Sequence, residues 1–221
     1  MCARFTIVLT PDGYVAIYDF DFGGITEQFT PRYNVAPTQK VAVVSDPANR
    51  KVQWMRWGLI PSWAKDPAIG NKMINARSET LIEKPSFKVA FQKRRCLILA
   101  DGFYEWQKNP GGHSIPYYFT LNGHQPFVFA GLWETWTPPS SQPIQSCTII
   151  TCPPNDLVVP VHDRMPVILN RASADLWLAQ TPLPQLQPLL TPYPAGDMQA
   201  VKVSQKVNSP AIESPDLIIP E

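Results

Sequence analysis

The sequence has few of the side chains that bind metal ions or form disulfide frameworks. It holds four cysteines and only three histidines in 221 residues, and no two cysteines form a C-x-x-C pair. This scarcity excludes the usual zinc templates and a scaffold held by disulfides. We therefore expect reduced thiols, no metal and no cofactor. Charged residues are also scarce, at 17%, whereas 44% of the residues are hydrophobic, which excludes a disordered chain.

Long apolar runs are absent as well. No stretch approaches the roughly 18 apolar residues that a membrane helix needs. The first residues carry an early arginine and are not followed by the apolar run of a secretory signal. We therefore expect a soluble protein of the cytoplasm, associated with the nucleoid in a bacterium, that has no membrane partner.

Proline is the residue in excess, with 25 copies. Proline lacks an amide hydrogen and clashes inside helices, which excludes long helical bundles and coiled coils. The chain length favours one domain over residues 1–221, with no internal repeat and no low-complexity tract. We predict a single α+β domain of short elements, rich in antiparallel strands.

The charges are unevenly distributed although the net charge is only +1. Residues 40–108 hold thirteen basic and six acidic side chains, whereas the segments before and after are net acidic. A basic middle can present a positive face to an anion such as nucleic acid. Folding can equally mix the segments so that no patch forms, and charge alone does not decide.

Alternation with a period of two predicts strands at residues 52–57 and 116–121. Apolar runs predict further strands at 96–100, 127–136 and 145–151, and Asn122-Gly123 favours a hairpin turn. Helices are expected at 86–93 and 171–178, the second capped by Ser173 or Asn170. The five prolines of residues 181–194 exclude one continuous helix there, and residues 138–143 are interpreted as a surface loop.

Cys2 is the first candidate for chemistry. Methionine aminopeptidases act before small residues, so removal of Met1 would leave Cys2 as the N-terminus. Its amine (pKa about 8) and thiol (pKa about 8.5) would then both be partly deprotonated near neutrality. Such a 1,2-aminothiol condenses with an aldehyde to an imine, and the thiol closes on the imine to give a thiazolidine. A small residue at position 2 by chance is the alternative.

His162 is the second candidate, because imidazole transfers protons at neutral pH. Asp163 either orients the imidazole or pairs with Arg164, and the alternative is a structural surface turn. Glu105 is the third candidate. If Phe103 faces the core, the strand period places Glu105 on the same apolar face, where its pKa would rise. A solvated glutamate at a strand end is the alternative.

Asn75 and Arg77 lie two residues apart, so on an extended segment they share a face suited to a sugar and a phosphate. The same stretch also resembles the start of a short helix at residue 78. Asn34 lies in what we interpret as a polar turn. Trp57 and Trp63 lie in one loop, where they either stack on unpaired bases or belong to the core.

Taken in order, these segments closely resemble the SRAP family, the SOS response-associated peptidase or abasic-site processing proteins. The resemblance spans essentially the whole chain, and six ordered blocks make it specific. The matching blocks are residues 1–5, 32–39, 57–63, 74–80, 100–106 and 162–166, with 203–204 and 207–208 near the C-terminus.

The resemblance implies a barrel-like, mostly antiparallel β core with short flanking helices. It also implies binding of abasic sites in single-stranded DNA and a covalent, protective crosslink through Cys2 in the DNA damage response. We expect a monomer. An opened abasic sugar is an aldehyde, which is the electrophile that an N-terminal aminothiol traps. The family usually has glycine where this chain has Ala3, and the added methyl group is expected to slow the reaction. No motif for a replication partner is evident.

The resemblance also assigns roles to individual residues. Cys2 is the nucleophile, His162 and Glu105 move protons, and Asn75 binds the sugar. The expected DNA-binding residues are Arg4, Arg77, Asn34, Trp57 and Trp63, with Asn34 supporting the pocket.

Other activities remain open at this point. One is a thiol peptidase or autoprotease built on cysteine, histidine and glutamate. Another is a non-covalent module that binds single-stranded DNA. Strand cleavage by β-elimination from the imine, an AP-lyase activity, is a side reaction of the proposed chemistry.

Overall fold

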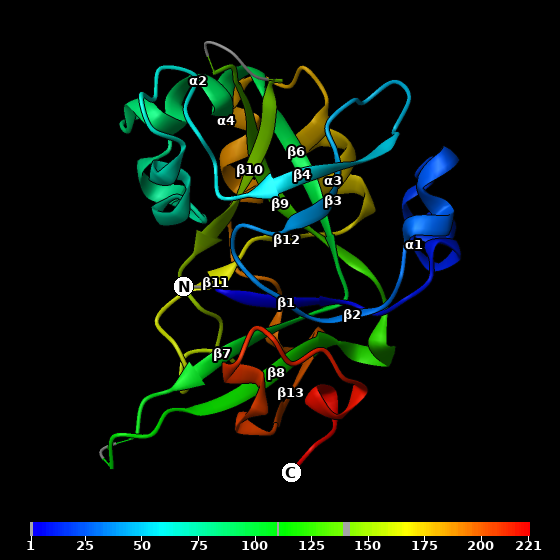
Figure 1. Cartoon of the computed structure of the whole chain (residues 1–221), viewed down its shortest axis with the longest axis vertical. Helices are drawn as coiled ribbons and strands as arrows, with labels where there is room; N and C mark the ends of the chain where they lie inside the picture. The colour runs from blue at the N-terminus through cyan, green and yellow to red at the C-terminus, as the bar shows by residue number, and fades with distance from the viewer. Residues whose placement is uncertain (1, 110, 139–141) are drawn as a thin grey trace.

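The strands of the chain form two sheets, and one of these closes into a barrel (Figure 1). The computed structural model describes residues 2–109, 111–138 and 142–221. Its strands are β1 (Arg4–Ile7), β2 (Arg32–Val35), β3 (Lys40–Val44), β4 (Val52–Trp57), β5 (Asn75–Arg77), β6 (Arg95–Ala100), β7 (Gly102–Gln107), β8 (Ile115–Leu121), β9 (Phe127–Trp136), β10 (Ile144–Cys152), β11 (Met165–Pro166), β12 (Ile168–Leu169) and β13 (Met198–Lys202).

The barrel is a ring of five strands in the order β10-β4-β3-β6-β9, closed because β9 also pairs with β10. All its pairings are antiparallel except β10 with β4. Large apolar side chains fill its interior, which gives one continuous core. The predicted α+β fold with a barrel-like, mostly antiparallel core is therefore confirmed.

The second sheet has the order β13-β8-β7-β1-β2 and lies below the barrel in Figure 1. The chain passes from β6 of the barrel to β7 of this sheet at Asp101. The Asp101 carboxylate accepts hydrogen bonds from the Thr6 hydroxyl and from the backbone amides of Val8 and Leu9. These bonds tie the end of β1 to the crossing point.

The helices are short, as the proline content predicts. They are α1 (Pro11–Tyr18), α2 (Pro85–Lys93), α3 (Arg171–Leu178) and α4 (Leu183–Leu186), with 3-10 turns at Gly23–Gln28, Pro67–Lys72, Ser78–Thr80, Asn122–His124, Gln187–Leu189, Ala195–Asp197, Gln205–Asn208 and Pro215–Ile218. No helix among the described residues is long and apolar enough to cross a bilayer.

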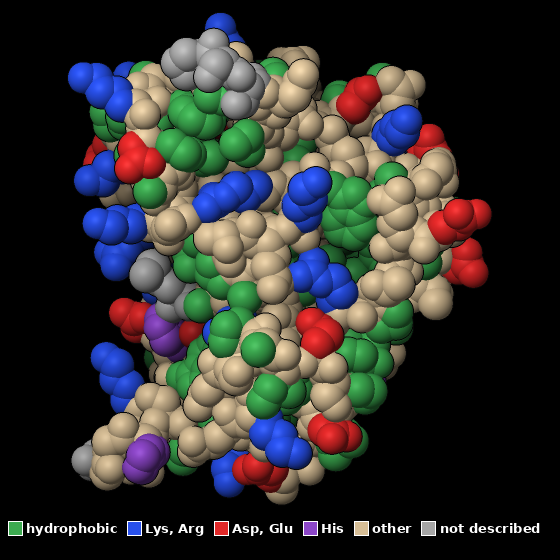
Figure 2. Space-filling model, viewed as in Figure 1, with side chains coloured by type: hydrophobic (Ala, Val, Ile, Leu, Met, Phe, Trp, Pro, Cys, Tyr) green, Lys and Arg blue, Asp and Glu red, His purple; other side chains and the backbone are tan. Residues whose placement is uncertain are grey.

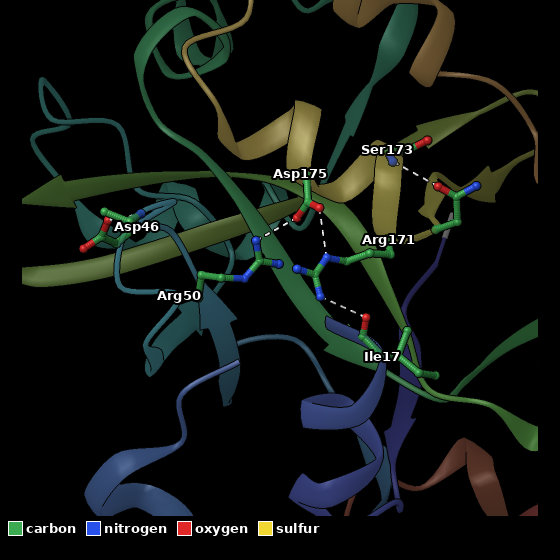
Figure 3. A network of polar contacts seen from close by, with 8 residues as sticks. Ile17, Asp46, Arg50, Arg171, Ser173 and Asp175 are labelled. Carbon is green, nitrogen blue, oxygen red and sulfur yellow. Dashed lines mark hydrogen bonds and ion pairs between the residues drawn. The ribbon is translucent and has the colours of Figure 1, made fainter. Parts of the chain in front are cut away.

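Helix α3 is held at its start and along its length by polar contacts (Figure 3). Asn170 Oδ1 accepts from the Ser173 amide at 2.9 Å, so Asn170 is the cap. Asp175 binds Arg50 at 2.7 Å and Arg171 at 2.9 Å. The Arg171 guanidinium also donates to the Ile17 carbonyl, which links α3 to α1.

Two local predictions were wrong. Asn122-Gly123 does not form a hairpin, because β8 pairs with β7 and β13 whereas β9 belongs to the barrel. The turn instead carries the chain from one sheet to the other. The segment expected to be a polar turn around Asn34 is strand β2, since Val35 pairs with Phe5 of β1. The predicted loop at 138–143 falls partly on residues 139–141, outside the described residues.

Candidate active site

Strand β7 carries Glu105 into the interior beside the first residues of the chain. Phe103 and Glu105 alternate onto one face, and both are buried. Strand β1 runs antiparallel to β7 with Arg4 opposite Tyr104. Continued by two residues, that register brings Cys2 alongside Glu105 and Trp106. The buried-glutamate interpretation is therefore confirmed.

Cys2 is fully buried, and its carbonyl oxygen accepts a hydrogen bond from Asn75 Nδ2 at 2.8 Å. Burial, with the negative charge of Glu105 added, raises the pKa of the Cys2 thiol far above its ordinary value. The sulfur is therefore a neutral thiol at neutral pH and needs a base when it reacts. Met1, whose removal the sequence predicts, lies outside the described residues.

Glu105 and His162 form the titratable pair of the site, with His162 Nε2 3.8 Å from Glu105 Oε2. Burial raises the pKa of Glu105 to about 7. Burial also lowers the pKa of His162 below its ordinary value. At neutral pH the carboxyl therefore exists in both protonation states, and the imidazole is mostly neutral.

The His162 ring is oriented by its own turn. In the neutral imidazole with its proton on Nε2, the nitrogen that faces Glu105, Nδ1 accepts from the Arg164 amide at 3.0 Å. Asp163 Oδ1 lies 3.1 Å from Nδ1 and forms an ion pair with the ring when the imidazole is protonated. Arg164 does not pair with Asp163 but binds Glu79 through both guanidinium nitrogens, at 2.5 and 2.9 Å. Of the two roles considered for Asp163, the contact to the imidazole is the one present.

Asn75 and Arg77 lie on β5, which pairs in parallel with β10. Residues 75–77 are extended, as required for Asn75 and Arg77 to share a face. A 3-10 turn begins at Ser78, where the sequence also resembles the start of a short helix. Asn75 Oδ1 is buried without a hydrogen-bond partner among the described residues, although its amide nitrogen holds the Cys2 carbonyl. Arg77 is exposed. The amide of Asn75 therefore lies beside Cys2, and Arg77 follows two residues later on the same strand.

Arg4 and Asn34 both bind residues 207–213, which we call the C-terminal segment, and the half-buried Arg4 stays a predicted phosphate contact. Arg4 Nη1 donates to Asn34 Oδ1 at 3.0 Å and to the Val207 carbonyl at 2.6 Å. Asn34 is fully buried, and its amide donates to three carbonyls of the segment. Direct contact of Asn34 with DNA is therefore excluded, and its supporting role is the one that fits.

The two tryptophans differ in their exposure to solvent. Trp57 is fully buried and donates from Nε1 to the Ile74 carbonyl at 2.9 Å, so its prediction as a DNA-stacking residue was wrong. The end of β4 points it into the core beside Phe5. Trp63 is 59% exposed and remains available for stacking.

A groove of about 420 Å³ opens beside His162, between the end of β7 and the turn before His162. Its wall includes Trp106, whose Nε1 donates to Asn208 Oδ1 at 2.7 Å. The roles of Arg164 and Asn208 were missed from the sequence. Both belong to blocks that match the family, but their partners are distant in the chain. Among the described residues, no cluster of side chains suited to a metal ion is present.

Comparisons with known proteins point to one family. The profile of the family described as "SOS response associated peptidase (SRAP)" matches residues 1–210. The chain is 46% identical to the abasic site processing protein YoqW of Bacillus subtilis, over 99% of each chain. It is 34% identical to the abasic site processing protein HMCES of Gallus gallus, over 87% of this chain and 67% of that one. A crystal structure from Bacteroides thetaiotaomicron superposes over all of both chains, with a TM-score of 0.89 at 25% identity.

Proposed function

Because the chain belongs to the SOS response associated peptidase (SRAP) family, we propose that it processes abasic sites in single-stranded DNA as part of the DNA damage response. In this proposal Cys2, exposed as the N-terminus by removal of Met1, forms a protective thiazolidine crosslink with the opened sugar. Two relatives named as abasic site processing proteins support the substrate class. The chemistry rests on the site itself.

One observation carries the proposal: Cys2 lies within a cluster that can bind a sugar and move protons. Asn75 holds its carbonyl at 2.8 Å, and Glu105 is close enough to shift the thiol pKa. Glu105 in turn faces His162 at 3.8 Å. A buried cysteine with only a packing role has no need of a carboxyl whose pKa is close to neutrality.

The reaction has two bond-forming steps. The amine of Cys2 first adds to the aldehyde carbon of the opened sugar, and loss of one water gives an imine. The thiol then adds to the imine carbon, forming the C–S bond, while the thiol proton moves to the nitrogen. Because amine and thiol belong to one residue, the second step is intramolecular and gains from proximity.

Glu105 and His162 supply the proton transfers of these steps. A carboxyl with a pKa of about 7 donates a proton to the departing hydroxyl and recovers it afterwards. The neutral imidazole accepts a proton when the sugar ring opens or when the thiol reacts. The thiol needs such a base because burial keeps it protonated.

DNA binding falls to residues around this cluster. Asn75 Oδ1 is available to a sugar hydroxyl, Arg77 to a flanking phosphate and exposed Trp63 to an unpaired base. Arg4 contributes by fixing the C-terminal segment against β1.

The alternatives have less support. A thiol peptidase gains from a thiolate beside an imidazolium, but here burial raises the pKa of the Cys2 thiol and lowers that of His162. A non-covalent DNA-binding module has no use for the buried Glu105. β-Elimination from the imine is a minor branch, because ring closure consumes the imine.

The test is to incubate the processed protein with a single-stranded oligonucleotide that contains one abasic site. We expect an adduct that survives denaturation, with the summed mass of protein and DNA less one water. Cys2→Ala should abolish it, whereas Cys147→Ala, which changes another fully buried cysteine, should retain it. Intact-mass analysis of the free protein should show loss of Met1 alone.

Three results would contradict the proposal. The first is an adduct that persists in Cys2→Ala, and the second is the absence of any adduct from the processed protein. The third is cleavage of peptide bonds beyond Met1, which would favour the peptidase. Binding that ignores the abasic aldehyde and Cys2 would leave only the non-covalent module.

A further inference from the structure

Basic side chains gather on the outer face of the barrel, away from the Cys2 cluster. Lys40 of β3 lies directly opposite Arg56 of β4, and Arg32 of β2 donates to the Lys40 carbonyl at 2.7 Å. Figure 2 shows lysine and arginine side chains (blue) over the region where Figure 1 places β3 and β4. Among the described residues, none of these three cations forms an ion pair with a carboxylate. Their charge is therefore available to an anion.

An aromatic ring lies within this basic surface. Trp54 is two residues before Arg56 on β4, so both project from the same face of the strand. Gln28, Arg32, Lys40 and Trp54 line a hollow of about 280 Å³. The hollow is smaller than the roughly 300–1,000 Å³ of pockets for drug-sized ligands, and it suits one planar base. Phe29 packs against the Trp54 ring, with centroids 6.2 Å apart, and supports it.

One acidic group, Glu213 of the C-terminal segment, acts electrostatically on Arg32. Its carboxylate, however, accepts hydrogen bonds from the backbone amides of Tyr33 and Asn34 and is held there. The aromatic ring and the cations thus form a surface of the kind that binds nucleic acid, in which bases stack and phosphates pair with cations.

The strand pairing connects this surface to the candidate active site. On β10, Ser146 lies opposite Arg56 and Ile149 lies opposite Asn75. Three residues along a strand span about 10 Å. A DNA strand whose abasic sugar lies at Asn75 therefore reaches the level of Arg56 and Lys40 after about 10 Å, and the level of Trp54 after about 7 Å more.

We propose that this face of the barrel is a second subsite for single-stranded DNA, in which one base stacks on Trp54 and neighbouring phosphates lie against Lys40 and Arg32. The inference rests on the proposed function, since it extends the path of the same strand. The subsite adds affinity on one side of the abasic position. It takes no part in the chemistry at Cys2.

The test compares long and short oligonucleotides, by fluorescence anisotropy without an abasic site and by adduct formation with one. For strands of about 20 nucleotides, Lys40→Glu and Trp54→Ala should each weaken binding about tenfold. Lys206→Glu, an equal charge change in the 3-10 turn Gln205–Asn208, should not. An abasic site with two nucleotides on each side should bind and react with both variants as with the parent protein. At saturating DNA the rate of adduct formation should be unchanged.

Two further measurements identify the contacts. Lys40→Ala should lower the slope of log affinity against log salt by about 0.7, the value for one phosphate of a single strand. Trimming the DNA on one side of the abasic site should abolish the effect of both variants, whereas trimming the other side should not. Trp54→Phe keeps an aromatic ring and should keep most of the affinity. If Trp54→Ala does not fold, Trp54→Phe and the Lys40 variants test the subsite instead.

The inference is overturned if the Lys40 and Trp54 variants bind long strands as tightly as the parent protein. It is equally overturned if they lose the same factor on short strands, since that points to general damage. Failure of the proposed function gives a different result, because the parent protein then forms no adduct. The anisotropy measurement on long and short strands still tests whether Lys40 and Trp54 form a subsite for DNA.

Discussion

Glu105 is the residue at which fold and function make opposite demands. Its side chain is almost fully buried, and burial raises its pKa from 4.5 to about 7. In the unfolded chain the carboxyl ionises freely, so between these two pKa values the folded state holds more protons. The free energy of unfolding therefore falls as pH rises from about 4.5 to 7. The chain retains a destabilising carboxyl at the point where the proposed reaction needs a proton donor.

We predict that Glu105→Gln stabilises the protein at high pH and slows its reaction. The amide keeps the shape but cannot ionise, so the gain in unfolding free energy should grow by on the order of 3 kcal/mol between pH 4 and pH 8. Adduct formation should slow by roughly 10²-fold or more, and the inflection near pH 7 in the rate should disappear. Urea unfolding at both pH values and a pH–rate profile measure the two effects.

Glu83→Gln, at an exposed position, is the matched control and should change neither property. A Glu105→Gln protein that reacts at the parental rate would remove the carboxyl from the mechanism. A stability gain that does not depend on pH would show that the carboxyl does not titrate in this range.

Which tryptophan faces solvent could not be predicted from the residues themselves. Trp57 and Trp63 belong to one motif, yet Trp57 ends β4 pointing inward and Trp63 lies on the surface. That difference depends on where the strand ends and on which neighbour fills the core. Glu105 was predictable, because a single assumption about Phe103 fixes its face through the strand period.

At the scale of elements, the C-terminal segment is a structural part of the site. It binds Arg4 of β1, Asn34 of β2 and Trp106 of β7, and so holds three strands that surround Cys2. Its hydrogen bonds replace the water that these polar groups would otherwise bind. Much of the site's shape therefore depends on residues with no part in the chemistry.

We predict that Asn34→Ala destabilises the protein by about 2 kcal/mol, because the carbonyls of Val207, Ser209 and Ile212 lose the donor that the buried Asn34 amide provides. Adduct formation should slow as well, since Arg4 loses its partner. Chemical denaturation and the oligonucleotide assay measure the two losses. Asn49→Ala removes an exposed hydrogen bond from the Asn49 side-chain amide to the Asp46 carboxylate, and it should change stability by less than about 0.5 kcal/mol. Equal effects of the two substitutions would contradict this role.

The elements that sequence periodicity predicts are those whose pattern is local. Strands β4, β8 and β9 follow from alternation or apolar runs, and α3 follows from its cap. The parallel pairing of β10 with β4 and β5 could not be predicted, because nothing within β10 indicates its distant partners. β2 was missed for the same reason: its polar residues form a strand only because they pair with β1 and bind the C-terminal segment.

At the scale of the molecule, the crossing from barrel to second sheet depends on Asp101 and Gly102. Gly102 lies against a side chain of the neighbouring strand, and a Cβ there would collide with the ring and hydroxyl of Tyr118. That hydroxyl is 2.9 Å from the Thr6 hydroxyl, which bonds Asp101. This close approach of the Tyr118 side chain to the backbone requires glycine here.

We therefore predict that Gly102→Ala destabilises the whole protein by about 3 kcal/mol, since Tyr118 must move and disturb the Asp101 cluster. Thermal unfolding of Gly102→Ala, alone and in a Tyr118→Ala background, measures it. The loss caused by Gly102→Ala should be smaller in that background, because the ring that clashes with the new Cβ is gone. A single variant as stable as the parent protein would show that the two sheets join with more freedom than this contact allows.

The binding of Arg4 and Asn34 to residues 207–212 also orders events during synthesis. The first residues to leave the ribosome find their partners only after nearly the whole domain has been translated. Until then the start of the nascent chain is accessible to processing enzymes, whereas Cys2 in the folded protein is fully enclosed. The removal of Met1 that we propose therefore belongs to the time of translation, before the C-terminal segment binds Arg4 and Asn34.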